Sequence, residues 1–463
     1  MDILNTLRAA LPDDVFREAD ARYLEEPRGR WTGQAVAVLA PSSTPDVATI
    51  LRIANERGVP VVPYSGGTGL VGGQVKQGGT PPILLSLERM RAVRAMDAQA
   101  GTLTVEAGAI LSDVHGWAEA EGWIFPLTLA SQGSARIGGL LATNAGGVNV
   151  IRYGNARDLV LGVEAVLADG TIVNTLSPLR KNNTGYDLRH LLIGSEGTLG
   201  VITAASLRLF PKPAATGAAL MAVGSSAAAL ELLRLAQRRI GEGISAFELI
   251  GRMGFDFLAE VGPDIRQPFE TIPDYCCLID LGLSHGSPEA ALEALFAEAF
   301  EAGLVSDGVV AQSEGQRQEF WHIRESIPEA NRRVGSVSSH DISVPVARIP
   351  DFINAAPEAL GNIDQFRINC FGHLGDGNLH YNVFPMPGKT RADHEHQREA
   401  VKRAVHDLVA EMGGSVSAEH GIGRLKVDDL ERYGDPGKLA AMRAIKAALD
   451  PNNILNPGAV LRG

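Results

Sequence analysis

The stretch Pro-Tyr-Ser-Gly-Gly-Thr-Gly-Leu-Val-Gly-Gly at residues 63–73 decides how the first half of the chain is expected to fold. Two apolar segments precede it, 36–39 and 59–62, and both are typical of buried strands. A helix is predicted between them over 44–57, with Thr44 as its N-cap. Glycines let the backbone take positive φ and bring its N–H groups close to an anion. The stretch therefore predicts a loop that cradles a phosphate group, with a flexible hairpin as the alternative.

Two more glycine-rich regions follow the first. One covers 133–139 and 144–147, and the other covers 194–203. Each leaves or enters a segment that is predicted to be a strand. The first stretch lacks the Gly-Lys-Ser/Thr end of a Walker loop and the Gly-x-Gly-x-x-Gly pattern that opens a Rossmann helix. Three loops of this kind indicate a long ligand that is touched at several places.

In order and spacing, these segments resemble the FAD-binding domain of the vanillyl-alcohol oxidase and p-cresol methylhydroxylase flavoprotein superfamily over residues 30–210. The resemblance implies an FAD cofactor that lies along all three loops. Some members attach the flavin through a histidine just after the first loop, and because this chain has Gly69-Leu70 there, we expect noncovalent FAD. The resemblance assigns FAD binding to Ser65, Gly66, Gly67, Thr68, Gly138, Asn144, Gly147 and Ile202.

Composition narrows the class of partner. The chain has 463 residues, enough for two or three domains, and a net charge of −12. This acidic balance disfavours nucleic acid or an anionic membrane as a partner. Three cysteines are too few for a disulfide framework or an iron–sulfur cluster, and the sequence has neither a basic leader nor an apolar span of about 18 residues. We therefore expect a cytoplasmic protein without a membrane span that acts on small molecules.

A second informative stretch is Phe-Gly-His-Leu-Gly-Asp-Gly-Asn-Leu-His-Tyr-Asn at 371–382. Asp376-Gly377 predicts a two-residue type I′ turn between two strands. That turn would place His373 directly opposite His380, with Cβ atoms roughly 5 Å apart, so that both rings could bind one ion. The strand period of two places Asn382 on the same face. Two half-exposed histidines on an ordinary hairpin are the alternative.

Glu419 and His420 lie in a third stretch, Ser-Ala-Glu-His-Gly-Ile-Gly at 417–423. With His373 and His380, Glu419 would complete a set of two histidines and one carboxylate. Such sets hold catalytic divalent metals and leave positions open for water or substrate. Zinc is the metal expected first, although manganese, iron and cobalt accept the same ligands. In isolation the stretch could equally be a plain loop.

Across nearly the whole chain, these stretches resemble the D-2-hydroxyglutarate and D-lactate dehydrogenase group and the flavoprotein subunit of glycolate oxidase. The resemblance implies that His373, His380 and Glu419 hold a divalent metal. It also implies that His420 is the catalytic base and that Asn382 positions the substrate. A histidine has an ordinary pKa near 6.5, which suits proton removal from a hydroxy acid at neutral pH. The expected reaction is oxidation of a D-2-hydroxy acid to the 2-oxo acid, with hydride transfer to the flavin.

The resemblance also bears on the substrate's far end. In the hydroxyglutarate enzymes of this group, an arginine and a lysine hold the distal carboxylate. Arg324 matches the arginine, and a guanidinium suits a carboxylate. Ser339 stands where the lysine is expected. Either the substrate differs or other groups hold that end, and an ordinary helix ion pair is the alternative role for Arg324.

We therefore expect an α+β protein with three parts. A two-part FAD-binding domain of the vanillyl-alcohol oxidase type covers 1–212, an α+β cap covers 213–412, and a C-terminal segment over 413–463 completes the active site. The alternatives to a dehydrogenase are a flavoprotein subunit that needs an iron–sulfur partner and a flavin- or metal-binding protein without turnover. Electron-transfer flavoprotein, a quinone or an iron–sulfur protein is the expected electron acceptor, and a homodimer is the expected assembly.

Overall fold

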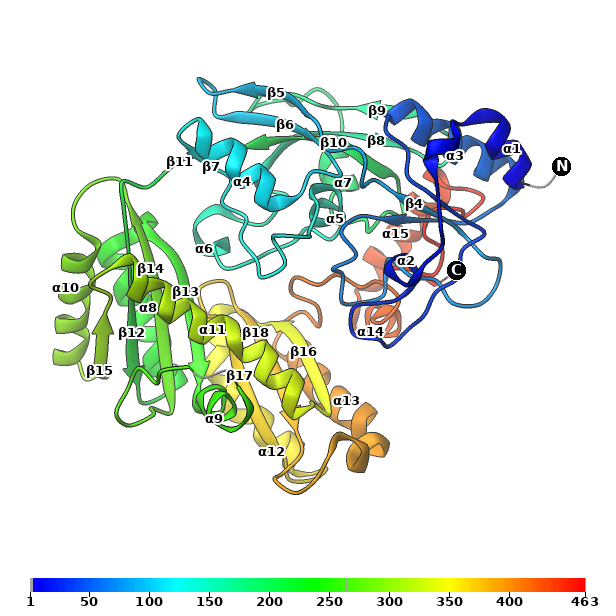
Figure 1. Cartoon of the computed structure of the whole chain (residues 1–463). Coiled ribbons are helices and arrows are strands. Elements are labelled where there is room, and N and C mark those ends of the chain that lie inside the picture. The colour runs from blue at the N-terminus through cyan, green and yellow to red at the C-terminus, as the bar shows by residue number, and fades with distance from the viewer. Residues whose placement is uncertain (1–2, 263–264, 463) are drawn as a thin grey trace. The chain divides into compact units, whose positions relative to one another are not determined.

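The computed structural model describes residues 3–262 and 265–462, which fold into two compact units (Figure 1). Unit 1 comprises 1–147, 154–212 and 419–463, and unit 2 comprises 148–153 and 213–418. Both units combine helices with sheets, which confirms the predicted α+β class. The domain limits predicted at 212 and 412 stay a prediction. Within the described ranges, no helix has the length and apolar character needed to cross a bilayer.

Unit 1 contains a four-stranded sheet in the order β1-β2-β4-β3, in which β2, β4 and β3 are parallel. Helix α3 (Thr44–Arg57) connects β2 to β3. Its N-cap is Ser43 rather than the predicted Thr44, because the Ser43 hydroxyl accepts the N–H of Asp46 at 3.2 Å. The strands are β1 (Phe16–Arg17), β2 (Ala37–Leu39), β3 (Val61–Tyr64) and β4 (Ile83–Ser86).

A second sheet of unit 1 has five antiparallel strands in the order β5-β6-β10-β8-β9. The C-terminal segment returns to the first sheet, where Leu455 forms a parallel bridge with Val61. The strands are β5 (Val93–Asp97), β6 (Thr102–Glu106), β8 (Val160–Val166), β9 (Ile172–Asn174) and β10 (Val201–Arg208). A two-stranded ribbon pairs β7 (Trp123–Ile124) with β11 (Phe210–Pro211). The remaining helices of unit 1 are α1 (Ile3–Ala10), α2 (Ala21–Leu24), α4 (Leu111–Ala120), α5 (Ile137–Ala142), α7 (Leu188–Leu192), α14 (Val427–Tyr433) and α15 (Pro436–Leu449).

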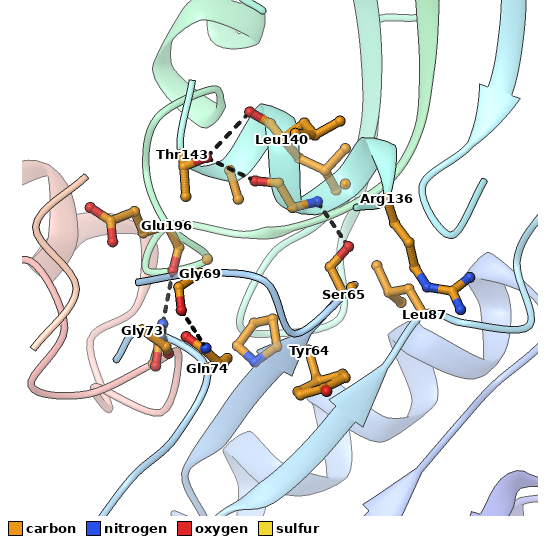
Figure 2. A pocket seen from close by; sticks show the side chains of 18 of the residues that line it. Tyr64, Ser65, Gly69, Gly73, Gln74, Leu87, Arg136, Leu140, Thr143 and Glu196 are labelled. Atoms are coloured by element: carbon orange, nitrogen blue, oxygen red, sulfur yellow. Dashed lines mark hydrogen bonds between the residues drawn. The ribbon is translucent and has the colours of Figure 1, made fainter. Parts of the chain in front are cut away.

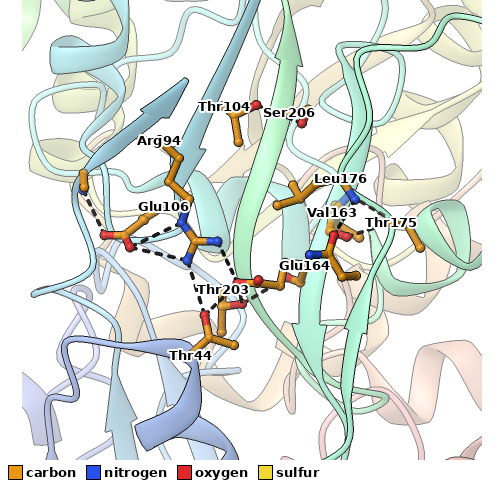
Figure 3. Close-up of polar contacts among 12 residues, drawn as sticks. Thr44, Arg94, Thr104, Glu106, Val163, Glu164, Thr175, Leu176, Thr203 and Ser206 are labelled. Carbon is orange, nitrogen blue, oxygen red and sulfur yellow. Dashed lines mark hydrogen bonds and ion pairs between the residues drawn. The ribbon is translucent and has the colours of Figure 1, made fainter. Parts of the chain in front are cut away.

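One buried carboxylate, Glu164 of β8, connects the five-stranded sheet to the start of helix α3 (Figure 3). It accepts hydrogen bonds from Thr44 at the start of α3 (2.6 Å) and from Thr203 of β10 (2.8 Å). Arg94 of β5 lies at 2.9 Å and also reaches Glu106. Burial alone would raise the pKa of Glu164, but these hydrogen bonds and the charge of Arg94 outweigh it and lower the pKa.

Unit 2 is built on a seven-stranded antiparallel sheet in the order β15-β12-β14-β13-β17-β18-β16. The strands are β12 (Ala215–Val223), β13 (Ile244–Gly251), β14 (Tyr275–Leu283), β15 (Val305–Val310), β16 (Ser338–Ser343), β17 (Arg367–His373) and β18 (Asn378–Phe384). The helices are α8 (Ser226–Ile240), α9 (Arg252–Val261), α10 (Pro288–Glu301), α11 (Glu314–Val334), α12 (Ile349–Gly361) and α13 (Arg398–Glu411).

Helix α11 lies across one face of this sheet (Figure 1). Residues 317, 321 and 324 are four and seven positions apart, so they share one side of the helix. Arg317 and Trp321 both donate to the buried carboxylate of Asp280 on β14. Arg324 donates to Glu248 on β13. The helix is therefore fixed to the sheet by polar contacts as well as by apolar packing.

A short strap of unit 2, residues 148–153, interrupts the sequence of unit 1 and contains helix α6 (Val150–Tyr153). Arg152 Nη1 donates to the carbonyl oxygen of Gly282 at 2.7 Å and to the hydroxyl of Ser245 at 3.0 Å. Ile151 packs against Gly375, where a Cβ would lie 2.4 Å from its Cδ1. The strap therefore packs on the loop that joins β17 to β18.

Candidate active site

The three glycine-rich regions of unit 1 meet around one pocket (Figure 2). His420 and Asn456 of the C-terminal segment also line it. Of the eight residues predicted to bind FAD, six line this pocket: Ser65, Gly66, Gly67, Thr68, Gly138 and Ile202. The pocket gathers the segments that the sequence assigned to one long ligand.

Close backbone packing explains why these positions are glycines. A Cβ on Gly66 would lie 2.4 Å from the carbonyl oxygen of Ser134, and one on Gly139 would lie 2.9 Å from Cβ of Ser65. The Ser65 hydroxyl accepts the N–H of Gly139 at 3.0 Å, and Figure 2 shows it reaching the first turn of α5. The first two glycine regions are therefore in direct contact, and side chains would fill the space between them.

Asn144 and Gly147 do not line the pocket. Asn144 has φ of +50° and its Oδ1 accepts the N–H of Arg157 at 2.9 Å. Gly147 has φ of +129°, and a Cβ there would lie 2.3 Å from the carbonyl oxygen of Thr128. Both residues shape the backbone just before the strap.

Arg136 also lines the pocket, although no role was predicted for it from the sequence. Figure 2 shows it at the side opposite Glu196. Its Nη1 donates to the carbonyl oxygen of Gly108 at 2.6 Å, which holds the side chain in place. A cation beside glycine walls and the hydroxyls of Ser65 and Thr68 fits the diphosphate of FAD. The signal in the sequence is that Arg136 is the cation within the second glycine region.

The loop that carries His420 is fixed to the third glycine region. Glu196 accepts the N–H groups of Ile422 and Gly423, both at 2.7 Å. Burial raises the pKa of Glu196 even though these hydrogen bonds oppose it. Arg424 donates to backbone oxygens of the first loop at 2.9 and 3.1 Å. This network holds the loop of His420 at the pocket, and His420 Nε2 lies 3.7 Å from Oε1 of Glu419.

In unit 2 the hairpin differs from its predicted register. The turn has four residues, 374–377, rather than the predicted two. His373 pairs with Asn378, and His380 pairs with Phe371, so the pairing is shifted by two residues. Gly377 has positive φ (+90°) and Asp376 does not, which is incompatible with the predicted type I′ turn.

The predicted face of the hairpin nevertheless holds, because a shift of two residues leaves each side chain on the same side of the sheet. The rings of His373 and His380 are diagonal neighbours with centroids 5.5 Å apart. Their ligand nitrogens lie within 4.8 Å of each other. Asn382 shares this face, pairs with Ser339 and is buried. Two imidazoles at this spacing could bind one metal ion.

Glu248 also lies on this face, although no role was predicted for it from the sequence. It pairs with His373 across β13 and β17 and is fully buried. His373 Nδ1 lies 2.5 Å from Oε1, and Arg324 Nε lies 2.7 Å from Oε2. Burial alone would raise the pKa of Glu248, but the charges and hydrogen bonds of His373 and Arg324 outweigh it and lower the pKa to about 2. The signal in the sequence is one acidic residue inside the apolar strand Ala-Phe-Glu-Leu-Ile.

Arg324 is buried on α11 and forms an ion pair with Glu248 on β13, which differs from the ordinary helix ion pair that was its alternative role. Only its Nε takes part. Its two Nη groups donate no hydrogen bond to any residue that the structure describes. The guanidinium stacks on Phe371, 4.9 Å from the ring centroid. A held guanidinium with two unused donor groups suits a carboxylate ligand.

Strand β16 brings further polar residues to the same face. It covers Ser338–Ser343. Asp341 pairs with His380 and accepts a hydrogen bond from Asn378 Nδ2 at 2.9 Å. Ser339 is exposed, and its hydroxyl lies 2.7 Å from that of Ser336. The N–H of Ala418 donates to the main-chain carbonyl oxygen of Asp341 at 3.3 Å, and Glu419 is the residue that follows Ala418.

Comparison with known proteins identifies both halves of the chain. Residues 35–176 match the FAD binding domain family, and residues 212–460 match the C-terminal domain of FAD linked oxidases. Mitochondrial D-2-hydroxyglutarate dehydrogenase of Bos taurus is 39% identical, over 98% of this chain and 82% of that protein. The enzyme of the same name from Xanthomonas citri is 38% identical, over 93% of this chain and 90% of that protein. The Arabidopsis thaliana mitochondrial enzyme is 38% identical, over 93% and 76%.

Solved structures support the same fold. The structure of p-cresol methylhydroxylase with bound substrate has a TM-score of 0.77 at 17% identity, over 99% of this chain and 96% of that one. Alkyldihydroxyacetonephosphate synthase has a TM-score of 0.73 at 18% identity, over 98% and 84%. These likenesses confirm the predicted fold of the vanillyl-alcohol oxidase and p-cresol methylhydroxylase type.

One expectation from the sequence is wrong. A cytoplasmic location was expected in part from the cysteine content, but the Bos taurus and Arabidopsis thaliana relatives are named as mitochondrial enzymes. A reducing environment and few cysteines do not distinguish between compartments of that kind.

Proposed function

The chain belongs to the D-2-hydroxyglutarate dehydrogenase family of FAD-linked oxidases, and on this premise we propose that a divalent metal assists its oxidation of a D-2-hydroxy acid to the 2-oxo acid. FAD is the redox cofactor of this reaction. Zinc is the metal proposed first, because two imidazoles and one carboxylate are common ligands of catalytic zinc.

The observation that carries the metal proposal is the proximity of His373 and His380 on one sheet face, together with the contact between His373 and Glu248. Buried histidines that bind metals usually donate their other ring N–H to a carboxylate. Glu419 is proposed as the third ligand. Its chain position supports this, because it directly follows Ala418, which is hydrogen-bonded to the residue paired with His380.

The chain's own residues have separate tasks in the proposed reaction. When bound, FAD would supply the hydride acceptor, and a metal held by His373, His380 and Glu419 would supply a Lewis acid for the hydroxyl and carboxylate of the substrate. His420 takes the hydroxyl proton as a general base, and its position among the residues that line the proposed FAD pocket supports this role. Asn382 orients the substrate, and the free Nη groups of Arg324 bind a second carboxylate.

The relatives' names favour D-2-hydroxyglutarate as the substrate, with D-lactate as the alternative. Arg324 supports a dicarboxylate. Ser339 supports the smaller acid, because a hydroxyl supplies no charge for a second carboxylate. Noncovalent FAD, a homodimer and an acceptor that is an electron-transfer flavoprotein, a quinone or an iron–sulfur protein stay predictions.

The test is anaerobic reduction of the flavin. The purified protein with its FAD is mixed with D- and L-2-hydroxyglutarate and with D- and L-lactate, before and after metal removal by a chelator. We expect a D acid to bleach the visible flavin absorbance, the chelated protein to fail, and added zinc to restore bleaching. Unchanged bleaching after complete metal removal would disprove metal assistance. An artificial dye as acceptor then shows whether the chain turns over without an iron–sulfur partner.

A further inference from the structure

Glu248 lies between two residues that have functional roles in the proposed reaction. Each of its carboxylate oxygens has a different partner, Oε1 with His373 Nδ1 at 2.5 Å and Oε2 with Arg324 Nε at 2.7 Å. Its side chain has no exposed surface. It lies on β13, whereas its partners come from β17 and α11, so it joins three elements that are distant in the sequence.

We propose that Glu248 is a positioning residue that holds His373 ready to bind the metal and, with its other oxygen, aims Arg324 at an anionic substrate. The inference rests on the proposed role of His373 as a metal ligand. An ionised carboxylate only accepts hydrogen bonds, so the hydrogen is on His373 Nδ1. In the neutral ring, which is the form that binds a metal, the lone pair is then on Nε2.

The same carboxylate fixes the direction of Arg324. The pair uses Nε alone and leaves both Nη groups, at the end of the guanidinium, without a hydrogen bond to the residues that the structure describes. The Phe371 ring supports the guanidinium from one side and lies 5.1 Å from the His380 ring, centroid to centroid. One buried carboxylate thus organises both the metal-ligand histidine and the arginine that would bind the substrate's far end.

A glutamine at this position could serve only one of the two partners. Its amide has one oxygen acceptor and one NH₂ donor, whereas the carboxylate has two acceptors. If the oxygen faces His373, the NH₂ group opposes the N–H of Arg324. If it faces Arg324, the NH₂ group requires an unprotonated Nδ1, which moves the ring hydrogen to Nε2 and blocks metal binding.

Asp280 provides a matched control. It is a buried carboxylate on the neighbouring strand β14 and on the same sheet face, since it pairs with Ala246 two residues before Glu248. It also fixes α11 to the sheet, through Arg317 at 2.8 Å and Trp321 at 2.7 Å. Among the residues that the structure describes, its hydrogen bonds and ion pairs do not include either histidine of the hairpin. Loss of Asp280 therefore tests the support of α11 without the support of a metal ligand.

The experiment measures metal affinity directly. FAD-loaded wild type, Glu248→Gln and Asp280→Asn are stripped of metal and titrated with Zn²⁺ against a chromophoric competing chelator. We expect Glu248→Gln to bind Zn²⁺ about 10- to 100-fold more weakly than wild type, the usual cost of losing such a partner. Asp280→Asn should keep the wild-type affinity. Glu248→Gln should also raise KM more for D-2-hydroxyglutarate than for D-lactate.

A double variant tests this explanation. It also provides a second measurement in case Glu248→Gln folds poorly. In Glu248→Gln/Arg324→Met the arginine no longer competes, so the glutamine oxygen is free to accept from His373. Zn²⁺ affinity should recover toward wild type, whereas the preference for the dicarboxylate should not. Wild-type affinity in Glu248→Gln, an equal loss in Asp280→Asn, or no recovery in the double variant would overturn the inference. If wild type itself binds no Zn²⁺, both the proposed metal site and this inference fail.

Discussion

The pocket of unit 1 and the polar sheet face of unit 2 are built in different ways. Eight of the residues that line the pocket are glycines, and at five of them (Gly66, Gly67, Gly138, Gly139 and Gly197) another residue lies within 3 Å of where a Cβ would be. The sheet face is made of side chains from β13, β16, β17 and β18, which are brought together by strand pairing. A pocket lined by glycine-rich loops can be recognised in the sequence from its runs of glycine. A site made of side chains from several strands depends on which strands become neighbours.

The largest expected effect separates chemistry from cofactor binding in unit 1. His420→Ala should lower kcat by about 10²- to 10⁴-fold, the usual contribution of a general base. FAD content and metal content should stay at wild-type levels, because His420 is proposed neither as a flavin-binding residue nor as a metal ligand. Stopped-flow measurement of flavin reduction gives the rate. His115→Ala is the control, since this half-buried histidine bonds the Leu127 oxygen and does not line the pocket. Near-wild-type turnover in His420→Ala would refute its role as the base.

The second prediction tests whether the pocket requires glycine where two of its loops pack closely together. Gly66→Ala would place a Cβ 2.4 Å from the carbonyl oxygen of Ser134, so the first two glycine regions must move apart. Overpacking of this kind costs about 1–3 kcal/mol, which corresponds to FAD binding weakened by about 5- to 150-fold. Titration of the apoprotein with FAD, followed by flavin fluorescence, measures it. The control is Gly133→Ala in the neighbouring loop, where a Cβ meets nothing within 4 Å. Equal FAD affinities in the two variants would argue against a requirement for glycine at residue 66.

The same difference explains how far the sequence could be interpreted. Ser65, Gly66 and Gly138 were predicted as FAD residues and line the pocket, because glycine requirements are local. The hairpin turn was predicted wrongly because tertiary contacts override the local preference of Asp-Gly. The N–H of Gly375 donates to the Phe247 oxygen at 3.3 Å, and the N–H of Val344 donates to the Gly377 oxygen at 3.1 Å. These contacts draw two more residues into the turn.

Glu248 could not have been predicted for a related reason. It is 125 residues from His373, and only the pairing of β13 with β17 brings them together. The period of two did predict that His373, His380 and Asn382 share a face, because it survives a shift of two residues. Face assignments are therefore more robust to errors in turn length than the identity of opposed residues.

The third prediction concerns a buried carboxylate of unit 1 that lies outside the pocket. Glu164 has a lowered pKa, so it adds stability above its unfolded pKa, near 4.3, and this stability is lost as the pH falls through the lower folded value. Glu164→Gln should lower the free energy of unfolding by about 1–3 kcal/mol at pH 7, because Arg94 and two hydroxyls lose a charged acceptor. Urea unfolding at pH 7 and below pH 4 measures it.

In acid the difference between wild type and Glu164→Gln should shrink, since protonation removes the charge that the mutation removed. Glu18→Gln, at an exposed position, is the control and should change stability little at either pH. FAD affinity should be unaffected at neutral pH. A constant gap between wild type and Glu164→Gln across this pH range would show that the carboxylate is not stabilised by its charge.

The smallest expected effect tests the side-chain site of unit 2 at its exposed end. Ser339→Lys adds a cation to the strand position paired with Asn382. Because the position is exposed, the gain for a second carboxylate is limited to about 0.2–1 kcal/mol, or up to about fivefold in KM for D-2-hydroxyglutarate. KM for D-lactate should not change, since that acid has no second carboxylate. Ser284→Lys adds the same charge in the turn after β14 and should leave both values unchanged. A similar fall in KM for both acids would mean that the lysine acts through the general field of the protein and that residue 339 does not contact the far carboxylate.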